Sequence, residues 1–181
     1  MLLLPLALAA GCGDGGEDER AAAERAAARP VEAAQLPQLH RCLGELSRQL
    51  READDDEAPS LVCLVGSYRG KSGQGEPCDL QINAPQRLFT LQLGARRIAL
   101  EWAPIAVDAL GRPVHNLEAA DLDERRPGVQ LRRFSAVPEP ITETLALQAG
   151  LPQAGPLGLP QIRYIRVQAG RAETWSCNFG A

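Results

Sequence analysis

Along residues 60–181, apolar and polar side chains alternate in short segments, and this feature restricts the fold more than any other. A period of two residues is typical of β-strands that bury one face. Gly94-Ala95 and Ala169-Gly170 fit tight turns between neighbouring strands, and no helical segment separates the strands as in a parallel sheet. We therefore predict a mainly β domain of about eight short strands, either an antiparallel barrel or a two-layer sandwich. The predicted strands cover residues 61–69, 78–82, 88–93, 98–102, 129–134, 142–148, 161–167 and 172–179.

A helical pattern precedes the β region. Leucines recur there at steps of three and four residues, which places them on one face of a helix. They are Leu36, Leu39, Leu43, Leu46 and Leu50. We predict a helix over residues 36–51 that packs alongside the β domain, with a short coiled coil as the alternative. The acidic run of residues 54–57 lacks the spaced ligands and the glycine of a calcium loop, so we interpret it as a solvated linker that ends at residue 59.

The N-terminal segment differs from both of these regions. Residues 1–11 form a compact apolar run that ends in small residues, a pattern typical of a signal peptide. The residues that follow are rich in glycine, then in alanine and charged residues, and they carry no apolar stripe. We predict that residues 12–35 form a flexible, acidic and alanine-rich tether, in which residues 18–29 favour a helix by composition and are either a marginal helix or disordered.

Two short segments resemble known bacterial proteins. Leu8-Ala9-Ala10-Gly11-Cys12 resembles the lipobox of bacterial lipoproteins. The resemblance implies cleavage before Cys12, lipid attachment to this residue, and the membrane as a partner through the N-terminal lipid. It also implies a location in the bacterial cell envelope, and Gly13 is compatible with the outer membrane, facing the periplasm. Residues 66–82 resemble the opening hairpin of small exported bacterial β domains of unknown function.

The cysteine count fits an exported chain. Of the five cysteines, Cys12 belongs to the lipobox, which leaves Cys42, Cys63, Cys78 and Cys177. An even remainder in an exported protein predicts two disulfides, with three possible pairings, and buried free thiols are the alternative. We favour Cys42–Cys63 and Cys78–Cys177, because the second bond would join an early strand to the last one. No pair has the Cys-x-x-Cys spacing of a metal site.

The charge changes sign along the chain. Residues 13–59 hold twelve acidic residues and six arginines, and residues 60–181 hold eleven acidic and thirteen basic residues, so the net charges are −6 and +2. This balance disfavours a nucleic-acid partner, and no apolar run approaches the ~18 residues that a membrane span needs. One face of the sheet could still be basic enough to meet an anionic polymer or a lipid head group, with a solvated face as the alternative. Because neighbouring strand residues point to opposite faces, a pair of adjacent arginines does not by itself form a basic patch. The arginines concerned are Arg96, Arg97, Arg125, Arg126, Arg132, Arg133, Arg163 and Arg166.

Few residues of the sequence could support catalysis. The two histidines are His40, on the predicted helix, and His115, in the long loop of residues 103–127. Loops of this length are uncommon unless they have a function or are mobile, so we name Arg112 and His115 as a candidate binding loop. The chain contains neither the Gly-x-Ser-x-Gly nor the His-Glu-x-x-His pattern, and residues 66–72 are one residue short of a phosphate loop. We predict no catalytic residue, no cofactor and no metal.

Together these patterns predict a non-enzymatic cell-envelope lipoprotein. Its β domain would bind another envelope component, such as an envelope protein, through a sheet edge or through the 103–127 loop. Three alternatives stay open. They are lipocalin-like binding of a small apolar ligand inside a barrel, the role of an envelope enzyme or enzyme inhibitor, and the role of a passive spacer.

Overall fold

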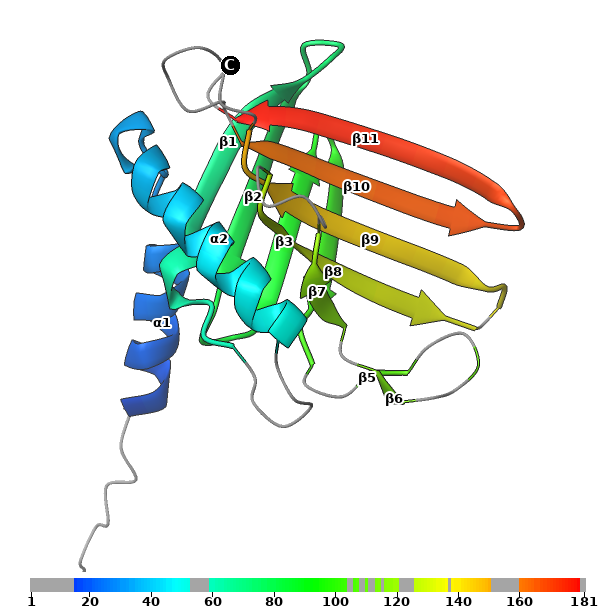
Figure 1. Cartoon of the computed structure of the whole chain (residues 1–181), viewed down its shortest axis with the longest axis horizontal. Coiled ribbons are helices and arrows are strands. Elements are labelled where there is room, and N and C mark those ends of the chain that lie inside the picture. Colours follow the sequence, from blue (N-terminus) through cyan, green and yellow to red (C-terminus); the bar gives the residue numbers. More distant parts are fainter. Residues whose placement is uncertain are drawn as a thin grey trace, which may run out of the picture.

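The main element of the fold is one nine-stranded antiparallel sheet, which curls into a half-barrel (Figure 1). Its spatial order is β4-β3-β2-β1-β11-β10-β9-β8-β7, and this arrangement confirms the predicted antiparallel β fold. The strands are β1 (Gly66–Ser72), β2 (Pro77–Asn83), β3 (Leu88–Leu93), β4 (Arg96–Glu101), β7 (Leu117–Ala119), β8 (Gly128–Ser135), β9 (Ile141–Gln148), β10 (Gln161–Gln168) and β11 (Arg171–Phe179). The computed structural model of the chain describes residues 15–52, 59–103, 106–107, 110, 113–114, 116–120, 126–136, 138–150 and 160–179.

All eight predicted strands are present, and the structure adds three shorter ones. β5 (Ala106–Val107) and β6 (Pro113–Val114) pair with each other in a separate sheet, and β7 pairs with β8. These three strands fall in the segment predicted as a long loop. The sequence did not predict them, because two or three residues are too few to establish an alternating pattern.

The first predicted strand begins later than expected. Residues Val62–Leu64 form a 3-10 helix, and β1 begins only at Gly66. Leu61 and Leu64 are both buried, and a spacing of three residues brings them to the same side of a 3-10 turn.

The predicted amphipathic helix is α2 (Leu36–Glu52), which packs against β7 and β8 (Figure 1). Leu39, Leu43 and Leu46 are buried in the same apolar core as the strands. The Ser47 hydroxyl donates a hydrogen bond to the Gly128 carbonyl at 2.7 Å and accepts one from the Gly128 N–H at 2.9 Å. The helix is thus joined to β8 by polar as well as apolar contacts.

Of the two states predicted for residues 18–29 of the tether, helix or disorder, the structure shows a helix, and this helix is packed on the sheet. α1 (Gly15–Ala27) packs on β1 and β2, and the methyl groups of Ala23 and Ala27 are buried. Beyond the helix, the backbone at Arg29 and Val31 exchanges hydrogen bonds of 2.8 and 2.9 Å with Ser67. A narrow strip of alanines is sufficient to pack α1 on the sheet, because small side chains allow the helix to approach the sheet closely. The predicted signal peptide of residues 1–11, Cys12 and residues 53–58 of the predicted linker lie outside the described residues.

Two blocks of strands make up the sheet, and they meet at one place. β1–β4 follow one another in space as in sequence, and so do β7–β11. We call the pairing of β1 with β11 the seam, and its register pairs are Gly70 with Phe179, Lys71 with Asn178, and Ser72 with Cys177. The rings of Tyr68 and Phe179 lie 5.9 Å apart beside it.

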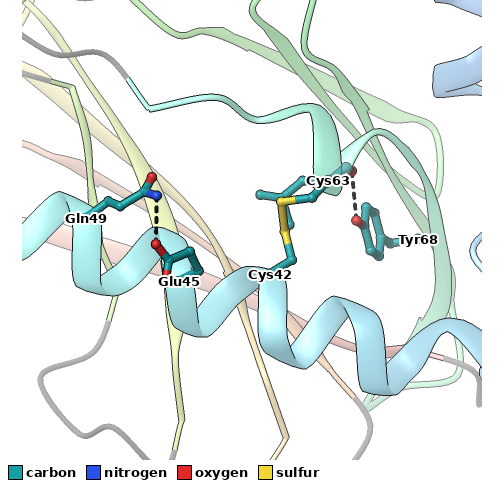
Figure 2. Close-up of a disulfide and its surroundings, with 6 residues drawn as sticks. Cys42, Glu45, Gln49, Cys63 and Tyr68 are labelled. Carbon is teal, nitrogen blue, oxygen red and sulfur yellow. Dashed lines mark hydrogen bonds between the residues drawn. A yellow bond between two sulfur atoms is a disulfide. The ribbon is translucent and has the colours of Figure 1, made fainter.

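The disulfides fasten two different parts of this fold. Cys42 is bonded to Cys63, so α2 is joined to the 3-10 helix before β1 (Figure 2). Nearby, the Tyr68 hydroxyl donates a hydrogen bond to the Leu64 carbonyl at 2.7 Å. Cys78 is bonded to Cys177, and this bond joins β2 to β11 across the seam. This is the pairing that we favoured from the sequence.

Candidate functional site

The inner face of the half-barrel changes from apolar to charged along the strands. On β9, Leu147 and Leu145 are buried in the core, and Glu143 follows on the same face. On β10, Tyr164 is buried and Arg166 follows it in the same way. The charged residues therefore gather toward the ends of the strands near the β8–β9 and β10–β11 turns.

Strand register places charges of alternating sign in a row. Arg133 pairs with Glu143, Glu143 with Arg166, and Arg166 with Glu173, across β8, β9, β10 and β11. From β4, Arg96 approaches the row, with its Nη1 4.0 Å from Glu173 Oε2. We call these five residues the rim. Because β4 curls toward β8, Arg133 Nη1 donates a hydrogen bond of 3.0 Å to the Ala99 carbonyl and bridges the two strands.

A cavity of about 580 Å³ opens at the rim, between β4 and β8. Four of its lining residues are arginines and one is a carboxylate, which gives a net charge of +3. The apolar lining residues belong to β4, β8 and β9. The lining residues are Arg96, Arg97, Ile98, Ala99, Arg133, Phe134, Ser135, Ile141, Glu143 and Arg166.

A second hollow of about 390 Å³ lies at the β10–β11 turn. It shares Arg166 with the first cavity and is also lined by Glu139, Arg171 and Glu173. Arg166 therefore reaches both hollows.

Glu143 holds Arg133 in place. The Tyr164 hydroxyl donates a hydrogen bond to Glu143, and Arg133 donates to the same carboxylate through Nη2 and, at 2.8 Å, through Nε. The carboxylate side chain is only 13% exposed, and its burial alone would raise the pKa of Glu143. The hydrogen bonds from Tyr164 and Arg133, together with the positive charges of Arg133 and Arg166, outweigh burial and lower that pKa below its ordinary value. Glu143 is thus an ionised anchor for the arginine, and it is a poor proton acceptor.

Arg96 is held by aromatic rings. Its guanidinium carbon lies 4.7 Å from the centre of the Trp175 ring and 5.8 Å from that of Tyr164. The two rings are themselves 5.4 Å apart. A cation over an aromatic face is attracted by the electron density of the ring, so Arg96 is kept at the cavity in a restricted set of orientations.

The tyrosines of the chain give a pH-dependent prediction. The chain has two tyrosines. Burial raises the pKa of Tyr68, and burial together with the hydrogen bond to Glu143 raises that of Tyr164. Because both pKa values lie above the ordinary 10.0, the folded state gains stability below pH 10 and loses it as the pH rises toward the folded pKa values. We expect tyrosinate absorbance to rise only together with unfolding, as followed by tryptophan fluorescence.

Tyr164→Phe serves as the control for this titration, because it leaves Tyr68 as the single tyrosine. If one tyrosine ionises near pH 10 while the fluorescence is still that of the folded protein, the burial of that ring is wrong.

The structure brings together some of the arginines that stood out in the sequence and separates others. Arg96, Arg97, Arg133 and Arg166 line the cavity. Arg132 points to the opposite face of β8 and forms an ion pair of 3.1 Å with Glu118. Arg163 is on the opposite face of β10 from Arg166, and Arg126 donates a hydrogen bond of 3.4 Å to Gln161. Arg125 lies outside the described residues.

The candidate binding loop remains a prediction. Arg112 and His115 lie outside the described residues, as does the predicted lipidation site Cys12. His40 lies on α2, as expected. Sequence reasoning missed Glu143, Tyr164, Glu173 and Trp175. The alternation pattern could have drawn attention to the two glutamates. Glu143 and Glu173 lie on the face of their predicted strands whose other residues within the predicted strand are apolar.

Two kinds of feature are absent from the described ranges. No group of three or more His, Cys, Asp or Glu side chains is placed to hold a metal ion there. No helix in the same ranges has the length and apolar composition for crossing a membrane. Comparison of the chain with protein-family models, with curated proteins and with solved structures found no match.

Proposed function

We propose that the protein is a non-enzymatic lipoprotein of the bacterial cell envelope, anchored by lipid on Cys12 in the outer membrane and facing the periplasm. The lipobox-like segment of residues 8–12 supports the anchor. Two disulfides support an oxidising compartment, because such bonds persist in exported proteins and are rare in the cytosol.

We further propose that the β domain binds another envelope component at the rim. The observation that carries this proposal is the cavity of about 580 Å³, because two of its four arginines, Arg96 and Arg133, are held in place before any ligand arrives. Glu143 orients Arg133, and the rings of Tyr164 and Trp175 orient Arg96. Side chains that are ordered in advance lose less entropy on binding, which favours a binding role over a merely solvated surface.

The other roles considered have less support. In a lipocalin-like protein the inside of the barrel is kept for an apolar ligand. Here the leucines of α2, including Leu43 and Leu46, occupy the apolar core together with those of the strands. An enzyme would need an acid or base at the cavity, and the carboxylate that lines it, Glu143, has a lowered pKa and is engaged with Tyr164 and Arg133.

The test uses the full chain in its native cells, with a photoreactive amino acid in place of Ile141, which lines the cavity. After irradiation, the protein is purified from membranes and its intact mass is measured before and after reduction and alkylation. We expect a chain that begins at Cys12, carries the mass of acyl groups, and takes up four alkyl groups only after reduction. A chain that keeps Met1 and alkylates without reduction would contradict the proposed anchor and compartment.

The same sample tests the binding role. We expect an added mass, or a crosslinked band, on the Ile141 variant. A second variant carries the photoreactive group in place of Arg41, which is exposed on α2, and it should give no such product. Equal labelling at both positions, or labelling at neither, would contradict binding at the rim.

A further inference from the structure

We infer that the rim binds the phosphate group of a phosphate monoester. This inference names the ligand class for the binding role proposed above and rests on that role.

The charge of the cavity favours a dianion. Arg96, Arg97, Arg133 and Arg166 carry four positive charges against the one negative charge of Glu143, a net of +3. If Glu173 is counted because it lies 4.0 Å from Arg96, the net is +2. A phosphate monoester carries about −1.5 to −2 charges at pH 7. It would bring the cavity close to neutrality, whereas a single carboxylate would leave at least one positive charge uncompensated.

The arginines of the cavity would contribute to phosphate binding in different ways. Three N–H donors of Arg133 already form hydrogen bonds, two with Glu143 and one with the Ala99 carbonyl. Arg133 therefore contributes mainly its positive charge, held at a fixed position, and few free donors. Arg166 forms no hydrogen bond or ion pair with any residue that the structure describes, although it stands between Glu143 and Glu173 in register. Its full set of donors is therefore available to a ligand. A planar guanidinium can give two parallel hydrogen bonds to one phosphate group.

Arg96 supplies the second set of donors. Its guanidinium is held over Trp175 and Tyr164, and its contact with Glu173, at 4.0 Å, is long for a charged hydrogen bond. Arg96 on β4 and Arg166 on β10 line the same cavity from different strands. A tetrahedral group with several oxygens can accept hydrogen bonds from both.

The size and the apolar lining indicate an ester and not free phosphate alone. Ligand cavities typically measure about 300–1,000 Å³, and this one, at about 580 Å³, is larger than a phosphate group. Ile98, Phe134 and Ile141 line it beside the arginines. They offer an apolar surface to the carbon atoms that carry the phosphate.

The experiment uses the full chain with Cys12→Ser, so that no lipid is attached, and measures binding by calorimetry at low salt. The soluble probes are glycerol 3-phosphate, inorganic phosphate and acetate. We expect both phosphates to bind and acetate to bind at least about 10-fold more weakly, since one charge-assisted hydrogen bond accounts for a factor of that order. Arg166→Gln should weaken glycerol 3-phosphate binding by about 10-fold or more for the same reason.

Arg41→Gln is the matched control, because it removes the same charge from an exposed position on α2 and should leave binding unchanged. Arg96→Lys keeps the charge but loses the planar donor set, and should also weaken binding. Circular dichroism checks that each variant is folded. Absence of phosphate binding to the folded parent chain would overturn the inference, and so would equal weakening by Arg166→Gln and Arg41→Gln.

Vesicles separate the two sources of a phosphate monoester. Vesicles of phosphatidylcholine with added phosphatidate are compared with vesicles of phosphatidylcholine alone. Selective binding to the phosphatidate vesicles assigns the site to a lipid head group, and binding of glycerol 3-phosphate without it assigns the site to a soluble ester. A chain that is acylated and crosslinks through position 141 but binds no phosphate would keep the proposed function and lose this inference. A chain that binds phosphate but keeps Met1 would lose the proposed anchor alone.

Discussion

Replacing Cys78 and Cys177 together by alanine is expected to lower the free energy of unfolding by about 2–5 kcal/mol. The bond joins residues that are 99 positions apart, so its loss frees most of the β domain in the unfolded chain. It also lies across the seam, where β1 and β11 are paired at three register positions. For a domain of ordinary stability this is a large share of the total.

The matched comparison is the double variant of Cys42 and Cys63, whose separation is only 21 residues. In the chain-entropy view, closing a loop of about 15 residues contributes about 3 kcal/mol and closing one of about 100 residues about 4.7 kcal/mol. Urea unfolding of both double variants, followed by tryptophan fluorescence, should therefore show the larger loss for Cys78 and Cys177. An equal or larger loss for Cys42 and Cys63 would contradict the expectation that the disulfide closing the longer loop contributes more stability.

Gly70→Ala is expected to destabilise the protein by about 1–3 kcal/mol or more, through the same seam. A Cβ atom at Gly70 would lie 2.0 Å from the Asn178 carbonyl oxygen and 2.8 Å from the carbon of that carbonyl. Both are backbone atoms of β11, so no side-chain rotation can relieve the contact. β1 and β11 must move apart where Gly70 pairs with Phe179.

Gly73→Ala is the control for this substitution. Gly73 lies just beyond the end of β1, and a Cβ atom there would meet no heavy atom within 4 Å. Its effect on urea unfolding should stay within about 0.5 kcal/mol. Similar midpoints for the two alanine variants would show that the approach of β11 to Gly70 is not as close as described.

Local patterns were sufficient for the elements that have a strong period. The leucine stripe predicted a helix over residues 36–51, and α2 spans Leu36–Glu52. The apolar and alternating segments of the β region predicted the eight longer strands, although the first of them begins at Gly66 and not at Leu61. In both cases one face of the element is buried. Apolar residues therefore recur along the sequence with the period of that element, and the period can be recognised without the structure.

Elements with a weak period were predicted less well. α1 buries only the small side chains of Ala23 and Ala27, and a strip of alanines does not stand out from an alanine-rich segment. β5, β6 and β7 are two or three residues long. What holds such elements in place is the neighbouring surface on which they pack, and that surface is built by residues distant in sequence.

The candidate site shows the same division more sharply. The residue pattern was sufficient to predict antiparallel strands within residues 60–181 and a helix before them, and it shows that arginines recur in the β region. Which arginine of a neighbouring pair faces inward depends on the strand parity, and Arg133 faces the cavity whereas Arg132 faces Glu118. That Arg96 and Arg166 line one cavity depends on the curl of the sheet, which brings β4 toward β8 although β4 and β10 are five places apart in strand order. Curl and register arise from packing between distant strands, and for this reason the tertiary structure alone decided where the charges meet.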